Sequence, residues 1–128
     1  MVTRLYEHSI FKEHITPLGH PERVDRLRAL EEALTAEPFQ LLDRVEAPRA
    51  DESAVLLAHP EKHLESTKAQ MPEEGFNRID EDTIAGPKTF EATLHALGAV
   101  MAAVDGVMNG DVDNAFVAAR PPGHHAEK

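Results

Sequence analysis

The stretch AFVAARPPGHHAEK, residues 115–128, decides the fold class because it joins an apolar run directly to a rigid loop. Residues 115–119 are five apolar residues without a break, a pattern typical of a strand buried on both faces of a parallel sheet. Open α/β sheets place their ligand sites at the carboxyl ends of such strands. The stretch therefore predicts a central strand that carries a functional loop.

Two adjacent histidines, His124 and His125, follow Pro121, Pro122 and Gly123 in this loop. The prolines fix two backbone φ angles, so the residues after them are held in place. Histidine titrates near neutral pH, and a positioned pair can divide the roles of general base and general acid. The alternative is an exposed loop or the start of a purification tag, although a tag would be a longer run of histidines. We interpret the pair as a candidate catalytic site.

Two upstream segments have helical periodicity. Residues 21–36 are predicted to form a helix that begins at Pro21 and buries one apolar stripe, made of Val24, Leu27, Leu30 and Leu34. A second helix is predicted from near Pro87 to Asn109-Gly110, with a buried stripe made of Phe90, Leu94, Leu97, Met101, Val104 and Met108. Gly98 lies inside it and costs about 1 kcal/mol relative to alanine unless something packs closely there.

Shorter elements complete the order strand, helix, strand, helices, strand. We predict strands at residues 2–6 and 39–48, and two helical pieces within residues 51–70 that are broken at Pro60. Residues 71–83 have no periodicity and are predicted to be a loop. The chain is predicted to be a single α/β domain, residues 1–128.

The composition excludes several classes of protein. The absence of cysteine excludes disulfides and a cysteine-type zinc site. With 13 basic and 23 acidic residues the net charge is −10, which disfavours a nucleic-acid partner. No apolar run approaches 18 residues and the N-terminus lacks the apolar block of a signal peptide, so neither a membrane span nor export is expected. The predicted location is the cytoplasm.

The segment NAFVAARPPGHHA, residues 114–126, resembles the signature of the histone deacetylase and acetylpolyamine amidohydrolase family. Three further segments are similar to the family's in the same order: GHPERVDRLRAL (19–30), AHPEKHLE (58–65) and DEDTIAGPKTFEATLHALGAV (80–100). Val24 stands where a proline is usual, and His63 replaces a tyrosine. The resemblance implies a partial arginase/deacetylase-like three-layer fold, with a small, mainly parallel sheet flanked by helices, that corresponds to the N-terminal part of a deacetylase domain.

In that family a zinc ion activates the water that attacks the amide of an acetylated lysine or polyamine. The resemblance implies that His124 is the general base, that His125 is the general acid, and that Asp82 contacts the substrate. The family's zinc ligands and its oxyanion-stabilising tyrosine lie downstream of the histidine loop, and the sole tyrosine here is Tyr6. We therefore expect a truncated relative that binds no zinc and is inactive alone.

Two other hypotheses stay open, a non-catalytic oligomerisation or binding module and one half of a split deacetylase. A sheet that lacks its later strands leaves apolar edges that invite pairing, so we expect a homodimer.

The other histidines are weaker candidates for functional residues. His59 and His63 are four residues apart and could share a helix face that holds zinc, but Pro60 favours two surface histidines. His95 is interpreted as a partly packed residue on the second helix, and the histidines near the N-terminus form no motif.

Overall fold

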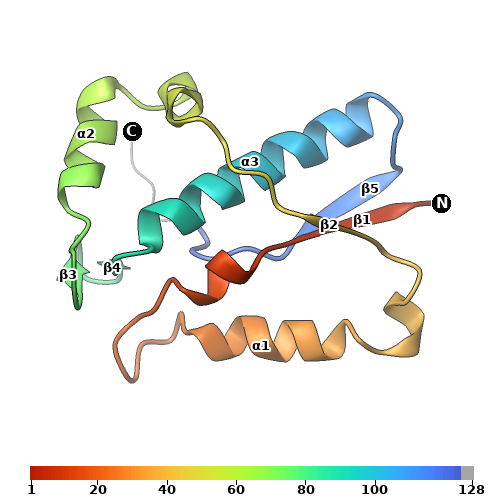
Figure 1. The fold of residues 1–128 in the computed structure, drawn as a ribbon, viewed down its shortest axis with the longest axis horizontal. Coiled ribbons are helices and arrows are strands. Elements are labelled where there is room, and N and C mark those ends of the chain that lie inside the picture. The colour runs from red at the N-terminus through yellow and green to blue at the C-terminus, as the bar shows by residue number, and fades with distance from the viewer. Residues whose placement is uncertain (125–128) are drawn as a thin grey trace.

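A three-stranded parallel sheet lies at the centre of residues 1–124, the part of the chain that this computed structural model describes (Figure 1). Strand β1 (Thr3–Glu7) is the middle strand, and β2 (Asp43–Glu46) and β5 (Asn114–Val117) pair with its two sides. All pairings are parallel, so the carboxyl ends of the three strands meet at one edge of the sheet.

Helix α1 (Val24–Ala33) lies on one side of the sheet and α3 (Thr89–Met108) on the other (Figure 1). This layering confirms the predicted three-layer α/β fold with a small parallel sheet. Both layers bury apolar side chains against the middle strand, whose Leu5 and Tyr6 are 0% and 2% exposed. The core consists of Leu5, Tyr6, Phe11, Leu27, Leu34, Ala47, Ala92, Ala99 and Ala118.

Short elements connect the layers. In the described part of the chain, 3-10 helices occur at Ser9–Lys12, Glu37–Phe39 and Glu52–Leu57, and α2 spans Glu61–Ala69. The predicted break at Pro60 is confirmed, because this proline is the residue before α2. The predicted loop 71–83 is partly wrong, since β3 (Asn77–Arg78) forms a small antiparallel hairpin with β4 (Ile84–Ala85).

Helix α1 begins three residues later than predicted, at Val24 instead of Pro21. The reason is that the backbone of Glu22 makes other bonds. Its N–H donates to Nδ1 of His20 at 3.1 Å, and its carbonyl oxygen accepts from the hydroxyl of Thr16 at 2.7 Å. Most of the predicted apolar stripe is confirmed, because Leu27 and Leu34 lie in the core and Leu30 packs against it, whereas Val24 is only half-buried.

The buried face of α3 differs from the predicted stripe. Leu94 is fully buried, but Met101, Val104 and Met108 are 40%, 55% and 80% exposed. The residues that pack against the rest of the molecule are mainly small, namely Ala92, Gly98, Ala99 and Gly106. Periodicity indicates which residues a helix can bury, but in the second half of α3 the described residues cover only the face that carries Ala99 and Gly106.

Gly98 shows why a glycine stands inside α3. The segment from Pro48 to Ala50 crosses the helix at this point, and the Ala50 N–H donates to the Leu94 carbonyl oxygen at 3.0 Å. A methyl group on Gly98 would overlap the Pro48 carbonyl oxygen and lie 2.7 Å from the Ala50 nitrogen. The backbone of the crossing segment therefore packs closely enough against Gly98 to require a glycine at this position.

Strand β5 is an edge strand, which corrects the prediction of a central strand buried on both faces. Its burial alternates, and Phe116 is 48% exposed. An unbroken apolar run predicts two buried faces, but the described residues cover only one face of this strand.

Helix α3 bears on the expectation that the chain contains no membrane span. Among the helices of residues 1–124 it alone is long and apolar enough to cross a membrane. It packs against β1 and β5. Length and composition alone do not define a membrane span, since core helices of globular proteins meet the same criterion.

A candidate histidine-loop site at the carboxyl ends of the strands

The loop after β5 leads to His124 at the edge of the sheet where the three parallel strands end. The imidazole of His124 is exposed, whereas Arg120, four residues earlier, is only 3% exposed. Gly123 has a φ of 77°, a left-handed conformation that glycine adopts without a steric cost. The second predicted catalytic residue, His125, lies outside the described residues.

Arg120 anchors the start of this loop in the interior. Its Nε and Nη2 atoms donate to the two carboxylate oxygens of Glu22 at 2.8 and 2.7 Å, a bidentate pair. Its Nη1 atom donates to the carbonyl oxygens of Phe11 and His14 at 3.0 and 2.7 Å. The loop after β5 is thereby fixed to the loop after β1, residues 8–23, from which Glu22 comes.

His14 and Thr89 extend the network to the N-terminus of α3. Both side chains are buried, and Nδ1 of His14 lies 2.8 Å from Oγ1 of Thr89. The same Thr89 oxygen accepts the Gly86 N–H at 2.8 Å. Nε2 of His14 lies 3.6 Å from the Glu22 carboxylate. One set of polar contacts therefore joins three separate segments beneath the histidine loop.

Glu22 is held as a carboxylate by this network. Burial raises its pKa, but the hydrogen bonds from His14 and Arg120 and the charge of Arg120 outweigh burial and lower the pKa from 4.5 to about 2. A carboxyl group with this pKa stays ionised at any physiological pH. It therefore binds Arg120 as a charged group.

Asp82, the predicted substrate-contacting residue, is exposed at the tip of the β3–β4 hairpin. Its carbonyl oxygen accepts from Nε2 of His20 at 3.1 Å, while Nδ1 of His20 accepts the Glu22 N–H. Since a carbonyl only accepts, His20 carries its proton on Nε2. The hairpin is therefore tied to the same loop, residues 8–23, to which Arg120 ties the histidine loop.

Sequence reasoning missed the buried pair of Glu22 and Arg120. A signal was present, because Arg120 directly follows the apolar run 115–119 and a buried guanidinium requires a carboxylate. The partner could not be identified from spacing, since 98 residues separate the two.

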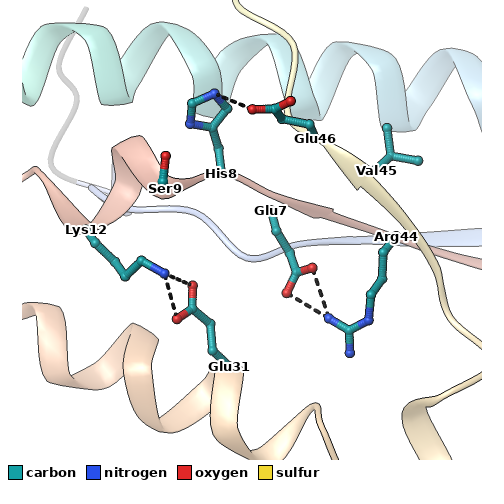
Figure 2. A pocket seen from close by; sticks show the side chains of 8 residues that line it. All are labelled: Glu7, His8, Ser9, Lys12, Glu31, Arg44, Val45 and Glu46. Carbon is teal, nitrogen blue, oxygen red and sulfur yellow. Dashed lines mark hydrogen bonds and ion pairs between the residues drawn. The ribbon is translucent and has the colours of Figure 1, made fainter.

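A hollow of about 340 Å³ lies beside the carboxyl ends of β1 and β2 (Figure 2). Most of the charged groups around it are already paired, in the ion pairs Lys12–Glu31 at 2.8 Å and Arg44–Glu7 at 2.9 Å, and Nε2 of His8 lies 3.2 Å from the Glu46 carboxylate. Groups that already pair with each other offer little to a charged ligand. We assign this hollow a structural role.

Two pairs of histidine rings lie in contact. His59 and His63 are stacked, with ring centroids 4.4 Å apart and an interplanar angle of 19°. Two nearly parallel stacked rings cannot both direct a nitrogen lone pair at one metal ion, which disfavours the zinc alternative. His95 packs against His8 at 4.1 Å and bonds through Nδ1 to the Ala47 carbonyl oxygen, in agreement with its interpretation as a partly packed residue.

A zinc ion, which the resemblance implies for the family, does not fit the described residues. Within residues 1–124 no three histidine, aspartate or glutamate side chains come together in a group that could hold a metal ion. A catalytic zinc site normally takes three protein ligands. We therefore derive no chemical step through a metal bound by this part of the chain.

The fold and the loop define an α/β protein with His124 at the carboxyl edge of a parallel sheet, and comparisons with known proteins identify its family. Residues 20–128 match the family model of the histone deacetylase domain. A histone deacetylase-like amidohydrolase of Pseudomonas aeruginosa is 34% identical over 108 residues, which are 84% of this chain and 28% of the relative. A probable deacetylase of Archaeoglobus fulgidus is 32% identical over 130 residues, covering 99% of this chain and 36% of the relative.

The fold is shared with a solved structure as well. The crystal structure of the HDA15 HD domain superposes with a TM-score of 0.89 at 24% identity, over 98% of this chain and 36% of that one. The chain belongs to the histone deacetylase family. It spans about a third of the length of these relatives.

Proposed function

We propose that this chain supplies the acid–base histidines of a deacetylase site that hydrolyses an acetylated amine. The observation that carries the proposal is the clamp formed by Glu22 and Arg120. A buried charged pair is costly to build, and this one fixes the entry to the loop that bears His124. The loop lies at the carboxyl edge of a parallel sheet, where α/β proteins bind their ligands.

In the proposed reaction His124 takes a proton from the attacking water, whose oxygen bonds to the carbonyl carbon of the acetyl group. The carbon–nitrogen bond then breaks, and His125 delivers a proton to the leaving amine. The products are acetate and the free amine. The negative charge that develops on the carbonyl oxygen needs an electrophile, which we propose comes from a polypeptide segment outside residues 1–124.

The proposed substrate class is an acetylated lysine side chain or an acetylated polyamine. Such substrates are carried on peptides or amines that are themselves cationic. A chain with a net charge of −10 attracts cations over several ångströms and so accelerates their encounter. Asp82, exposed on the hairpin beside the loop 8–23, is the proposed substrate contact.

Acetate release from an acetyl-lysine peptide and from an acetylated polyamine, with zinc present, tests this proposal. The chain alone should release no more acetate than its His124→Ala variant. When co-expressed with the part of the Pseudomonas aeruginosa relative that follows its matched region, it should turn over. The His124→Ala variant should then lose about 10²- to 10⁴-fold in rate. Turnover that survives in this variant would contradict the assigned role.

A second candidate function, a non-catalytic binding module, is favoured by one observation, the exposed apolar residues of α3. A module of this kind would bind its partner equally well in the His124→Ala variant and release no acetate in any combination.

A further inference from the structure

Both ends of the loop 8–23 are held by a histidine that accepts a backbone hydrogen bond. Nδ1 of His8 accepts the Ile10 N–H at 2.9 Å and so caps the first 3-10 helix. Nδ1 of His20 accepts the Glu22 N–H at 3.1 Å, just before α1 begins. Each imidazole therefore takes the place of the aspartate or asparagine oxygen that commonly bonds to an N–H two residues along the chain.

Two other turns of the chain use aspartate for the same bond. Asp51 accepts the Ser53 N–H at 2.9 Å at the start of another 3-10 helix, and Asp80 accepts the Asp82 N–H at 2.9 Å in the β3–β4 hairpin. A carboxylate remains an acceptor at any pH above about 5. An imidazole accepts only while it is neutral, because a second proton turns Nδ1 into a donor. The loop 8–23 therefore differs from these turns, since its acceptors belong to a residue type that titrates near neutral pH.

The second nitrogen of each ring is consistent with the neutral tautomer that these bonds require. Nε2 of His20 donates to the Asp82 carbonyl oxygen at 3.1 Å, and Nε2 of His8 lies 3.2 Å from the Glu46 carboxylate (Figure 2). Both rings thus carry their proton on Nε2 and leave Nδ1 as the acceptor. A second proton, on Nδ1, would set one N–H against another, and the bond to the backbone would be lost.

The charged groups around the two rings attract a second proton only weakly. The Glu46 side chain is 80% exposed and the carboxylates at the hairpin tip near His20 are exposed as well, so solvent screens their charges. On the α3 side the ring of His95 lies 4.1 Å from that of His8, and charges on both rings would repel each other. The other charged groups on the segments around these rings are Glu7, Lys12, Glu31 and Arg44 near His8, Arg49 and Glu91 near His95, and Glu22, Arg23, Arg26, Asp80, Glu81 and Asp82 near His20.

Arg120 is anchored by the loop that the two histidines hold. Its guanidinium donates to the carbonyl oxygen of Phe11 and to the carboxylate of Glu22. Phe11 lies in the 3-10 helix that His8 caps, and Glu22 is the residue whose N–H bonds to His20. Loss of either cap therefore loosens a residue that anchors the start of the histidine loop.

We propose that His8 and His20 are positioning residues of the candidate site, whose neutral rings hold the loop 8–23 and release it when acidification protonates them. They act on the histidine loop through Arg120. The inference rests on the proposed function only for what the histidine loop does, because the two backbone bonds and their loss on protonation concern this chain alone.

The direction of the pH dependence follows from the number of protons that each state binds. Above about pH 6.5, the ordinary value for histidine, the rings are neutral in the folded and the unfolded chain and both caps are present. Below it the unfolded chain takes up protons that the folded chain binds only by losing its caps, so stability falls as pH falls. Between pH 7.5 and 5.5 this lowers the folding equilibrium constant by about tenfold for each histidine.

His8→Asn and His20→Asn, separately and together, test the proposal, because asparagine places an oxygen where Nδ1 stands but does not titrate. Urea unfolding at pH 7.5, 6.5 and 5.5, followed by circular dichroism, measures the folding constant of each protein. NMR spectra of the isotope-labelled wild-type chain show which imidazole nitrogen carries the proton. His124→Asn is the matched control, since this imidazole is exposed and lies outside the loop 8–23.

Between pH 7.5 and 5.5 the folding constants of the wild type and the control should fall about 10²-fold further than that of the double variant. Each single variant should remove about tenfold of this difference. At pH 7.5 both rings should carry their proton on Nε2, and the Nε–H signal of Arg120 should change over the pH range in which stability falls.

Equal pH dependence in the wild type and the double variant would overturn the proposal, as would a proton on Nδ1 of His8 or His20 at pH 7.5. An Arg120 signal that stays constant would overturn the positioning role. None of these measurements involves catalysis, so a failure of the proposed function in the acetate assay and a failure of this inference can be distinguished.

Discussion

Glu22→Gln is the substitution that most directly tests the clamp beneath the histidine loop. It keeps the size of the side chain but removes the charge that two nitrogens of Arg120 contact at 2.7 and 2.8 Å. The pKa of Glu22 is about 2, against 4.5 for an unperturbed group. This difference corresponds to about 3 kcal/mol of folding free energy at about 1.4 kcal/mol for each unit. Breaking a fully buried pair typically costs about 3–5 kcal/mol, and because the Glu22 side chain is 15% exposed we expect a cost at the lower end of this range.

The pH dependence of this cost follows from the direction of the pKa shift. The folded pKa is lowered, so the stabilisation is complete above the unfolded pKa and is lost as pH falls toward the folded pKa. The wild-type chain should lose about 1 kcal/mol of this contribution by pH 4 and about 2 kcal/mol by pH 3. The Glu22→Gln variant has no ionisable group at this position, so the difference in the free energy of unfolding between wild type and variant should decrease as the pH falls.

Urea unfolding followed by circular dichroism at pH 7, 5.5 and 4 measures this difference. Glu91→Gln is the control, because Glu91 also binds an arginine through both carboxylate oxygens but is 41% exposed. An exposed pair contributes at most about 1 kcal/mol. The reasoning fails if the two substitutions cost the same, or if the cost of Glu22→Gln is equal at pH 7 and pH 4.

Three further predictions concern packing, the polar network and the loop. Gly98→Ala should destabilise the chain by about 1–3 kcal/mol in thermal melts, because the added methyl group meets the backbone of the segment from Pro48 to Ala50. The control Gly106→Ala should be neutral or stabilise by up to about 1 kcal/mol. Equal effects of the two substitutions would contradict the crossing of α3 by this segment. Thr89→Val should cost about 1–3 kcal/mol in urea unfolding, because it leaves a buried imidazole and a backbone N–H without their shared oxygen, and Thr89→Ser should recover part of this loss. His124→Ala should leave the melting temperature within 2 °C, roughly the size of a surface change, and a larger fall would assign His124 a structural role.

The helices and the α/β order could be predicted because they depend on local periodicity. Both long helices lie where apolar residues recur at intervals of three and four, and Gly110, with a φ of 77°, ends the second as its sequence indicates. The burial of α3 could not be predicted in the same way. Val104 and Met108 have the spacing of core residues, but their exposure depends on which other segments reach them. The position of β5 at an edge has the same cause.

The histidine loop of the candidate site could be predicted from the sequence, whereas the contacts that support it could not. The proline-rich lead and the paired histidines indicate a functional loop because each residue restricts the next. The clamp below the loop joins residues 98 positions apart, and no spacing rule connects them. Glu22 lies in a segment that the periodicity assigned to a helix, and its irregular backbone arises from tertiary contacts.

The central position of β1 sets the order in which the chain can fold. Thr3 pairs in register with Asn114, and the Val2 N–H donates to the Asp113 carboxylate, 111 residues away. The first strand synthesised can therefore pair with β5 only after both long helices have been made. Contacts of such high sequence separation slow folding, since a long loop must close before they form. We therefore expect the helices to form first as the chain leaves the ribosome. The sheet and the anchored histidine loop should then form together in a late, cooperative step.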